Sequence, residues 1–181
     1  MGSRHLTTAI KATRDANVTV RWLPFLLRHN IPKDGVPKGG TPESRAGARM
    51  KAAGQQVGID FTGLCDRYPN TLAYHALLKY AEETQPKKQN VLADILFRHY
   101  FTDGRYPAGE NLAAAATEAG LDGPEARRYA EDEDNQAAVA AEARANAQRG
   151  ISGVPFFIIN GEPAFSGAQQ PGAFVEIFEQ I

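Results

Sequence analysis

The sequence predicts an α/β fold in which a small sheet, built from both ends of the chain, encloses a long helical insertion. Strand-like segments lie near the ends, at residues 18–22 and 156–166, whereas most segments between them have helical patterns. Neither end alone holds enough strands for a stable sheet, so the two ends must meet in space. We therefore expect a β-containing domain made of residues 1–40 and 150–181, and a helical insertion domain of residues 41–149.

The first forty residues predict a helix, a strand and a loop. Residues 4–15 form the helix, with Leu6, Ile10 and Ala12 on its apolar face. Residues 18–22 alternate and contain β-branched side chains, which indicates a strand that Pro24 ends. Prolines and glycines crowd residues 30–40, so this segment predicts a loop.

The middle of the chain, from Pro42 to Arg149, predicts an almost wholly helical region. Thr41 followed by Pro42 is typical of a helix start, with a capping hydroxyl and a proline in the first turn. Further helices are expected to start near residues 70, 86, 110, 124 and 135, and Gly150 ends the last of them.

The segment from Gly150 to Gln169 predicts a proline-led hairpin followed by a closing helix. Pro155 precedes a short apolar strand, residues 156–160, and Asn160-Gly161 supplies a tight turn to a returning strand. Ser166 and Gln169 follow that strand and precede the last helix, so they predict either a helix cap or polar contacts to a ligand.

Four segments, in this order, resemble a known family: residues 20–25, residues 69–71 with His75, residues 150–157 and residues 166–169. They resemble the DsbA-like thioredoxin family, and within it the FrnE-type disulfide oxidoreductases, which are related to 2-hydroxychromene-2-carboxylate isomerase and kappa-class glutathione transferase. The resemblance covers essentially the whole chain and implies a thioredoxin-like fold with a cis proline at its site. It also implies that a thiol peptide or glutathione contacts Val154, Pro155, Trp22, Pro24, Phe25, Asn70, Ser166 and Gln169.

The sequence departs from this family at its reactive residues. FrnE-type chains open with a strand and a Cys-Pro-Trp-Cys motif, whereas residues 2–6 here resemble the segment directly after that motif. The first cysteine of such a motif attacks as a thiolate and the second resolves the mixed disulfide. We therefore expect a chain truncated just after the active-site motif, without its first β-strand and without a catalytic residue. Ser3 lies too far into its helix to replace the serine of the glutathione-dependent branches.

Three functional hypotheses fit this pattern. The chain is a DsbA/FrnE-like thiol–disulfide oxidoreductase that is inactive in dithiol exchange without its Cys-x-x-Cys motif, so its status as an enzyme is uncertain. The alternatives are a glutathione-dependent isomerase or transferase of the chromene-isomerase or kappa type, and a non-catalytic binding or assembly protein. A strand from a second copy or from a partner is expected to fill the missing sheet position.

Composition and charge bear on the binding partners, location and cofactors that we expect. The chain is 43% hydrophobic with a formal net charge of −1, and it has no basic patch and no long apolar run, so we expect neither nucleic-acid nor membrane binding. Its one cysteine, Cys65, is interpreted as a structural thiol and fits a reducing, cytoplasmic location. The four histidines have no metal-ligand spacing, so we expect no metal, and no cofactor except glutathione.

Overall fold

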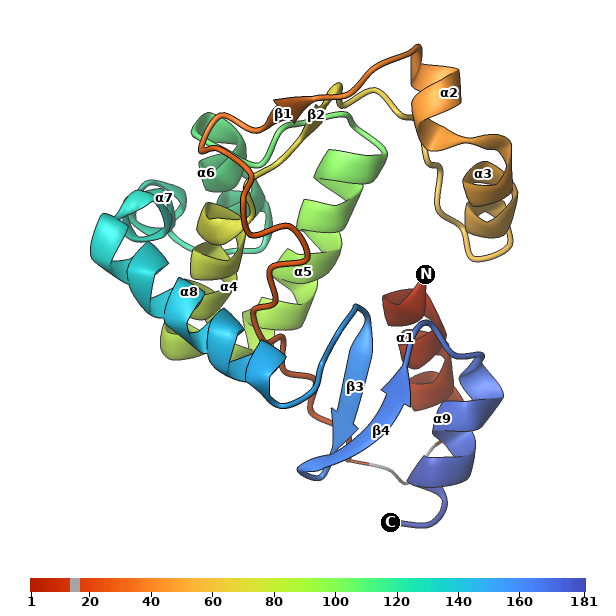
Figure 1. Ribbon diagram of the computed structural model, residues 1–181. Coiled ribbons are helices and arrows are strands. Elements are labelled where there is room, and N and C mark those ends of the chain that lie inside the picture. The colour runs from red at the N-terminus through yellow and green to blue at the C-terminus, as the bar shows by residue number, and fades with distance from the viewer. Residues whose placement is uncertain (14–16) are drawn as a thin grey trace.

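The computed structural model describes residues 1–13 and 17–181 of the chain (Figure 1). The predicted first helix is confirmed as α1, Gly2–Ala12, although the last two residues of the predicted range lie outside the described residues. At the other end of the chain, the predicted hairpin and closing helix are confirmed as β3, Phe156–Ile159, β4, Glu162–Ser166, and α9, Pro171–Phe178.

The two chain ends meet, as predicted. Helices α1 and α9 pack against each other beside the β3–β4 hairpin (Figure 1). A small apolar cluster holds them together, with Ala9, Phe174 and Phe178 buried at its centre. The ring of Phe174 lies edge-on to Phe157 and Phe165, at centroid distances of 4.9 and 5.2 Å. Because those two rings belong to β3 and β4, this one side chain joins α9 to both strands.

The hairpin turn has the conformation that its Asn-Gly sequence predicts. Asn160 and Gly161 both have positive φ, 52° and 90°, which is the backbone of the two-residue turn that Asn-Gly favours. The strands pair antiparallel from Phe156 opposite Ser166 to Ile159 opposite Glu162, with a register shift between Phe157 and Ile158. This register brings the start of β3, and Pro155 before it, next to the loop that leads into α9.

A larger helical block forms the other part of the molecule. Its five helices are α4, Leu72–Thr84; α5, Pro86–Phe101; α6, Glu110–Glu118; α7, Gly123–Glu131; and α8, Glu133–Gln148. Helix α4 contacts each of the other four (Figure 1). Many of the buried residues are alanines, such as Ala76, Ala81 and Ala115, which lets the helices approach closely.

The expectation that residues 42–149 are almost wholly helical was wrong in part. Two short helices come first, α2, Pro42–Ala46, and α3, Ala48–Gln55, and residues 56–71 are then mostly irregular. The predicted start of α2 is confirmed, since the Thr41 hydroxyl accepts the Ser44 N–H. The predicted loop at residues 30–40 contains a two-residue strand, β1, Val36–Pro37, which pairs with β2, Arg67–Tyr68.

The strand expected at residues 18–22 is not formed, and this prediction was wrong. The segment keeps the alternating burial of a strand, with Val18, Val20 and Trp22 partly buried and Thr19 and Arg21 exposed. It belongs to no ladder, however, and in the described part of the chain β3 pairs only with β4. A strand needs a partner for its backbone groups, and composition alone does not supply one.

Candidate functional site

The candidate site is the loop before β3 together with the start of α1. The peptide bond between Val154 and Pro155 is cis, and Val154 is half exposed at its outer side. Gly2, at the first turn of α1, is buried against this loop, and a Cβ there would lie 3.2 Å from Pro155 Cγ and 3.3 Å from Phe157 Cζ. The start of α1 therefore directly abuts the proline loop.

Three hydrogen bonds join the Pro155 loop, α1 and the loop before α9 to their neighbours. The Gly167 N–H donates to the Pro155 carbonyl at 2.8 Å, which continues the hairpin past β4. His5 Nδ1 lies 2.6 Å from the Gln169 carbonyl oxygen and so joins α1 to the loop before α9. The Gln169 amide donates to the Ser166 carbonyl at 3.1 Å. Ser166 therefore lies beside the start of β3, and Gln169 is bonded within the loop that follows β4. The predicted helix cap is wrong, because the N-cap of α9 is Gln170 and no side chain caps it.

Trp22, Pro24 and Phe25 lie on the segment that connects the two parts. The Gln89 amide pairs with both backbone groups of Trp22, at 2.9 and 3.1 Å, as a neighbouring strand would. The Trp22 indole N–H donates to the Asn90 side chain at 2.8 Å. These contacts fix Trp22 against α5, so its indole packs as part of the helical block.

The next residues of this segment are held in the same way. The Asn146 amide donates to the Pro24 carbonyl at 3.0 Å, and His75 Nε2 lies 3.2 Å from the Phe25 carbonyl oxygen. His75 thus joins α4 to the connecting segment. Burial lowers the pKa of His75 to about 4, so its ring is neutral at pH 7.

A polar cluster that the sequence did not reveal lies behind the start of α1. The Ser3 hydroxyl donates to Asp94 Oδ1 at 2.9 Å, which ties α1 to α5. The Tyr74 hydroxyl is buried with no hydrogen-bond partner among the described residues. Burial raises the pKa of Tyr74, and the charge of Asp94 raises it further. No local motif marks these residues, because three helices far apart in the sequence bring them together.

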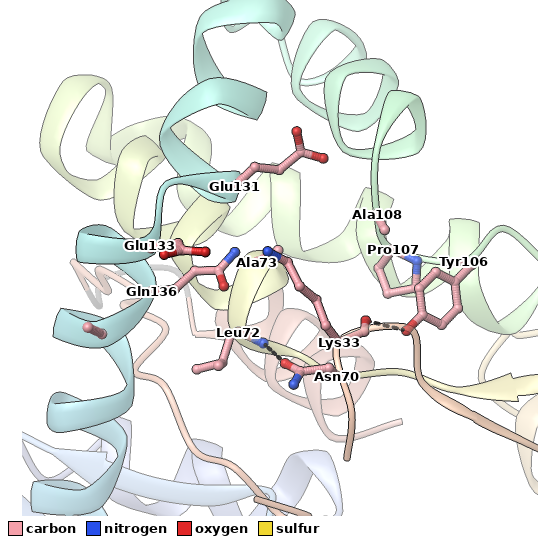
Figure 2. Close-up of a pocket in the computed structure, with 11 residues that line it drawn as sticks. Lys33, Asn70, Leu72, Ala73, Tyr106, Pro107, Ala108, Glu131, Glu133 and Gln136 are labelled. Atoms are coloured by element: carbon pink, nitrogen blue, oxygen red, sulfur yellow. Dashed lines mark hydrogen bonds between the residues drawn. The ribbon is translucent and has the colours of Figure 1, made fainter. Parts of the chain in front are cut away.

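Asn70 lies elsewhere, in a pocket of about 400 Å³ between the loop at Lys33 and helices α4, α7 and α8 (Figure 2). Its side chain accepts the Leu72 N–H at 3.0 Å and donates to the Ile31 carbonyl at 2.8 Å. Asn70 therefore starts α4 and anchors a loop. No lining residue of this pocket belongs to the Pro155 loop.

Cys65 lies in the irregular segment between α3 and α4 and is buried, at 5% exposure. Its thiol contacts the Arg67 carbonyl at 3.6 Å, and the Lys38 ammonium donates to the Cys65 carbonyl at 3.1 Å. Burial lowers the pKa of Lys38, and the neighbouring cysteine opposes this. Cys65 thus precedes β2, away from the Pro155 loop in the sequence.

A family model and a solved structure match this chain. The family model of the DSBA-like thioredoxin domain matches residues 1–179. The structure is similar to that of a probable DsbA oxidoreductase from Streptomyces coelicolor, with a TM-score of 0.81 and 29% identity over 99% of this chain and 82% of that one. No curated protein matches the chain. The fold is thus thioredoxin-like with helical additions, and the chain belongs to the DsbA-like thioredoxin family.

Proposed function

We propose that this chain is the peptide-binding body of a FrnE-type thiol–disulfide oxidoreductase. The loop at Val154 and Pro155 binds an extended thiol peptide, or glutathione, against the start of α1. Dithiol exchange needs a nucleophilic and a resolving thiol at that helix start, and the 181 residues contain only Cys65, which is buried elsewhere. The chain alone therefore binds such peptides without turning them over.

The observation that carries this proposal is the contact between Gly2 and Pro155. Within the DsbA-like family, a thiol at the start of the first helix works opposite this proline loop, and here helix and loop touch. The exposed side of Val154 leaves its backbone open to pairing with an extended ligand. A glutathione-dependent mechanism has less support, because Ser3 is bonded to Asp94 behind the helix.

A second part of the proposal concerns the open sheet. Strand β4 leaves one edge of β3 unpaired. A partner strand pairs with this edge and fills the slot between β3 and the extended residues 17–22. This partner is an apolar, extended segment from a second copy or another polypeptide, because the neighbouring side chains Val18, Phe157 and Ile159 are apolar. Unpaired buried backbone groups cost about 1–3 kcal/mol each, so filling the slot stabilises the hairpin.

We assign residues 1–40 and 150–181 to the thioredoxin-like domain and residues 41–149 to the helical insertion domain. The separate apolar clusters support this division for residues 1–18 and 150–181, whereas Trp22 packs against the cluster of the helical block. A reducing compartment such as the cytoplasm suits a chain whose only thiol is buried and unpaired. Among the described helices, none has the length and apolar character needed to cross a membrane.

The experiment is a binding titration with a peptide that contains S-methylcysteine, which cannot react. We expect saturable binding, followed by calorimetry or by amide chemical shifts at β3. Val154→Trp covers the exposed wall of the loop and should weaken binding at least tenfold. Val36→Trp is the matched control, because Val36 is also exposed but lies on β1, at the other end of the molecule (Figure 1).

Two outcomes would contradict this proposal. One is equal binding by the Val154→Trp and Val36→Trp variants, which would place the peptide elsewhere. The other is turnover of a disulfide substrate by the unmodified chain that is lost in Cys65→Ser, because the buried thiol would then be the nucleophile.

A further inference from the structure

The pocket beside Asn70 has no role in the proposed thiol site. It lies between the loop carrying Lys33, the loop at Tyr106 and Pro107, and helices α4, α7 and α8 (Figure 2). The Tyr106 hydroxyl donates to the Lys33 carbonyl at 3.4 Å, which links the two loops across its rim. Its volume of about 400 Å³ lies at the small end of the range for ligand sites.

The charged side chains of this pocket have opposite signs, and they differ in whether they already have a partner. Glu131 is occupied, since its carboxylate accepts the Gly109 N–H at 3.1 Å and pairs with Arg127 at 3.0 Å. By contrast, neither the Lys33 ammonium nor the Glu133 carboxylate has a hydrogen-bond or ion-pair partner within residues 1–13 and 17–181. Lys33 extends from its loop toward the first turn of α8, where Glu133 lies (Figure 2).

The rest of the lining suits a short ligand with an apolar body. Leu72 and Ala73 come from α4, Pro107 and Ala108 from the facing loop, and Ala137 from α8. Gln136 donates to the Ala130 carbonyl at 2.8 Å, which leaves its carbonyl oxygen free to accept a hydrogen bond.

These features select one ligand class. A simple anion would be repelled by the unpaired Glu133, and a simple cation would be repelled by Lys33. A zwitterion satisfies both signs, with its carboxylate on Lys33 and its ammonium on Glu133. We propose that this pocket is a binding site for a small zwitterionic peptide of about dipeptide size, separate from the thiol site at Pro155.

The test is calorimetric titration of the full chain with glycyl-leucine, which has both charges and a small apolar body but no thiol. We expect saturable binding in the micromolar to millimolar range. The doubly capped dipeptide, N-acetyl-glycyl-leucinamide, should bind at least tenfold more weakly, because a charged hydrogen bond contributes more than about 1.4 kcal/mol, the equivalent of tenfold.

Variants locate the site. Lys33→Met and Glu133→Gln should each weaken glycyl-leucine binding about tenfold. Lys87→Met and Glu179→Gln are the matched controls, since both residues are exposed and lie outside the pocket, and they should leave affinity unchanged. Val154→Trp should also leave it unchanged, so failure of the thiol site and failure of this site are distinguishable.

Three results would overturn the proposal: no binding of glycyl-leucine at millimolar concentration, equal binding of the capped dipeptide, or unchanged affinity in both Lys33→Met and Glu133→Gln. Circular dichroism of each variant shows that its helices remain folded, so lost binding is not lost structure.

Discussion

The helical block and the thioredoxin-like part differ in the number of buried residues and of neighbouring elements that stabilise them. In the part of the chain that the structure describes, seventeen buried apolar residues form the cluster of the helical block, whereas three, Ala9, Phe174 and Phe178, are buried in the other cluster. Every helix from α4 to α8 has helical neighbours, but β3 has one strand partner among the described residues. The difference teaches that the helical block supplies most of the stability, while the part that carries the candidate site depends on a few contacts.

The largest effect is expected at Phe174, which is fully buried and touches both strands. Phe174→Ala should cost about 3–5 kcal/mol through lost burial and the cavity left behind. Because the small cluster has little else, we expect α1, α9 and the hairpin to unfold locally. Hydrogen exchange would then become fast in β3 and β4 while α4 and α5 stay protected.

Leu92→Ala is the control in the helical block, where Leu92 is equally buried. It should cost about 2–5 kcal/mol and lower protection throughout the molecule. If Phe174→Ala instead lowers the protection of α4 and α5 as much as that of β3, the two parts unfold as one unit and the contrast between them is wrong.

A pH-dependent effect of similar size is expected at His75, which joins α4 to the connecting segment. Its folded pKa of about 4 lies below the ordinary value of 6.5, so the unfolded chain binds the proton more readily. The contribution of neutral His75 is therefore complete above about pH 6.5 and is lost as the pH falls toward 4, by on the order of 3 kcal/mol.

The measurement is the free energy of unfolding by urea between pH 4 and pH 7. In His75→Gln this part of the pH dependence should vanish, since glutamine does not titrate. His29→Gln, at an exposed position, should keep the slope of the unmodified chain. Identical slopes in all three proteins would show that His75 is not held neutral by burial.

A smaller effect is expected at Gln89, whose buried amide replaces a strand partner for Trp22. Gln89→Leu should cost about 1–3 kcal/mol, because the Trp22 backbone groups lose their partner. Gln85→Leu, at the exposed start of α5, should be nearly neutral. Urea unfolding compares the two variants. Equal stabilities would mean that water pairs with Trp22 as well as the Gln89 amide does.

The smallest effect is expected at Cys65. Cys65→Ser replaces a buried thiol whose one contact is long, 3.6 Å to the Arg67 carbonyl, so we expect a cost of about 1 kcal/mol or less. Binding of the S-methylcysteine peptide should not change. A clear loss of that binding would connect Cys65 to the site at Pro155.

Prediction from the sequence succeeded where local signals decide the structure. Asn160-Gly161 specifies its own turn, and Thr41 followed by Pro42 specifies the start of α2. It failed at residues 18–22, because forming a strand depends on a partner that composition does not reveal. The Ser3–Asp94 bond and the Lys33 pocket could not be predicted from the sequence either, because only the packing of distant segments creates them.

The central claim is that the start of α1 and the Pro155 loop are the two walls of a thiol–disulfide site. It is tested most directly by attaching an apolar strand and a Cys-Pro-Trp-Cys motif ahead of Gly2, with Ser-Pro-Trp-Ser as the control. Insulin reduction with dithiothreitol should be accelerated by the first protein, but not by the control or the unmodified chain. A folded protein with free, titratable cysteines and no such acceleration would contradict the claim.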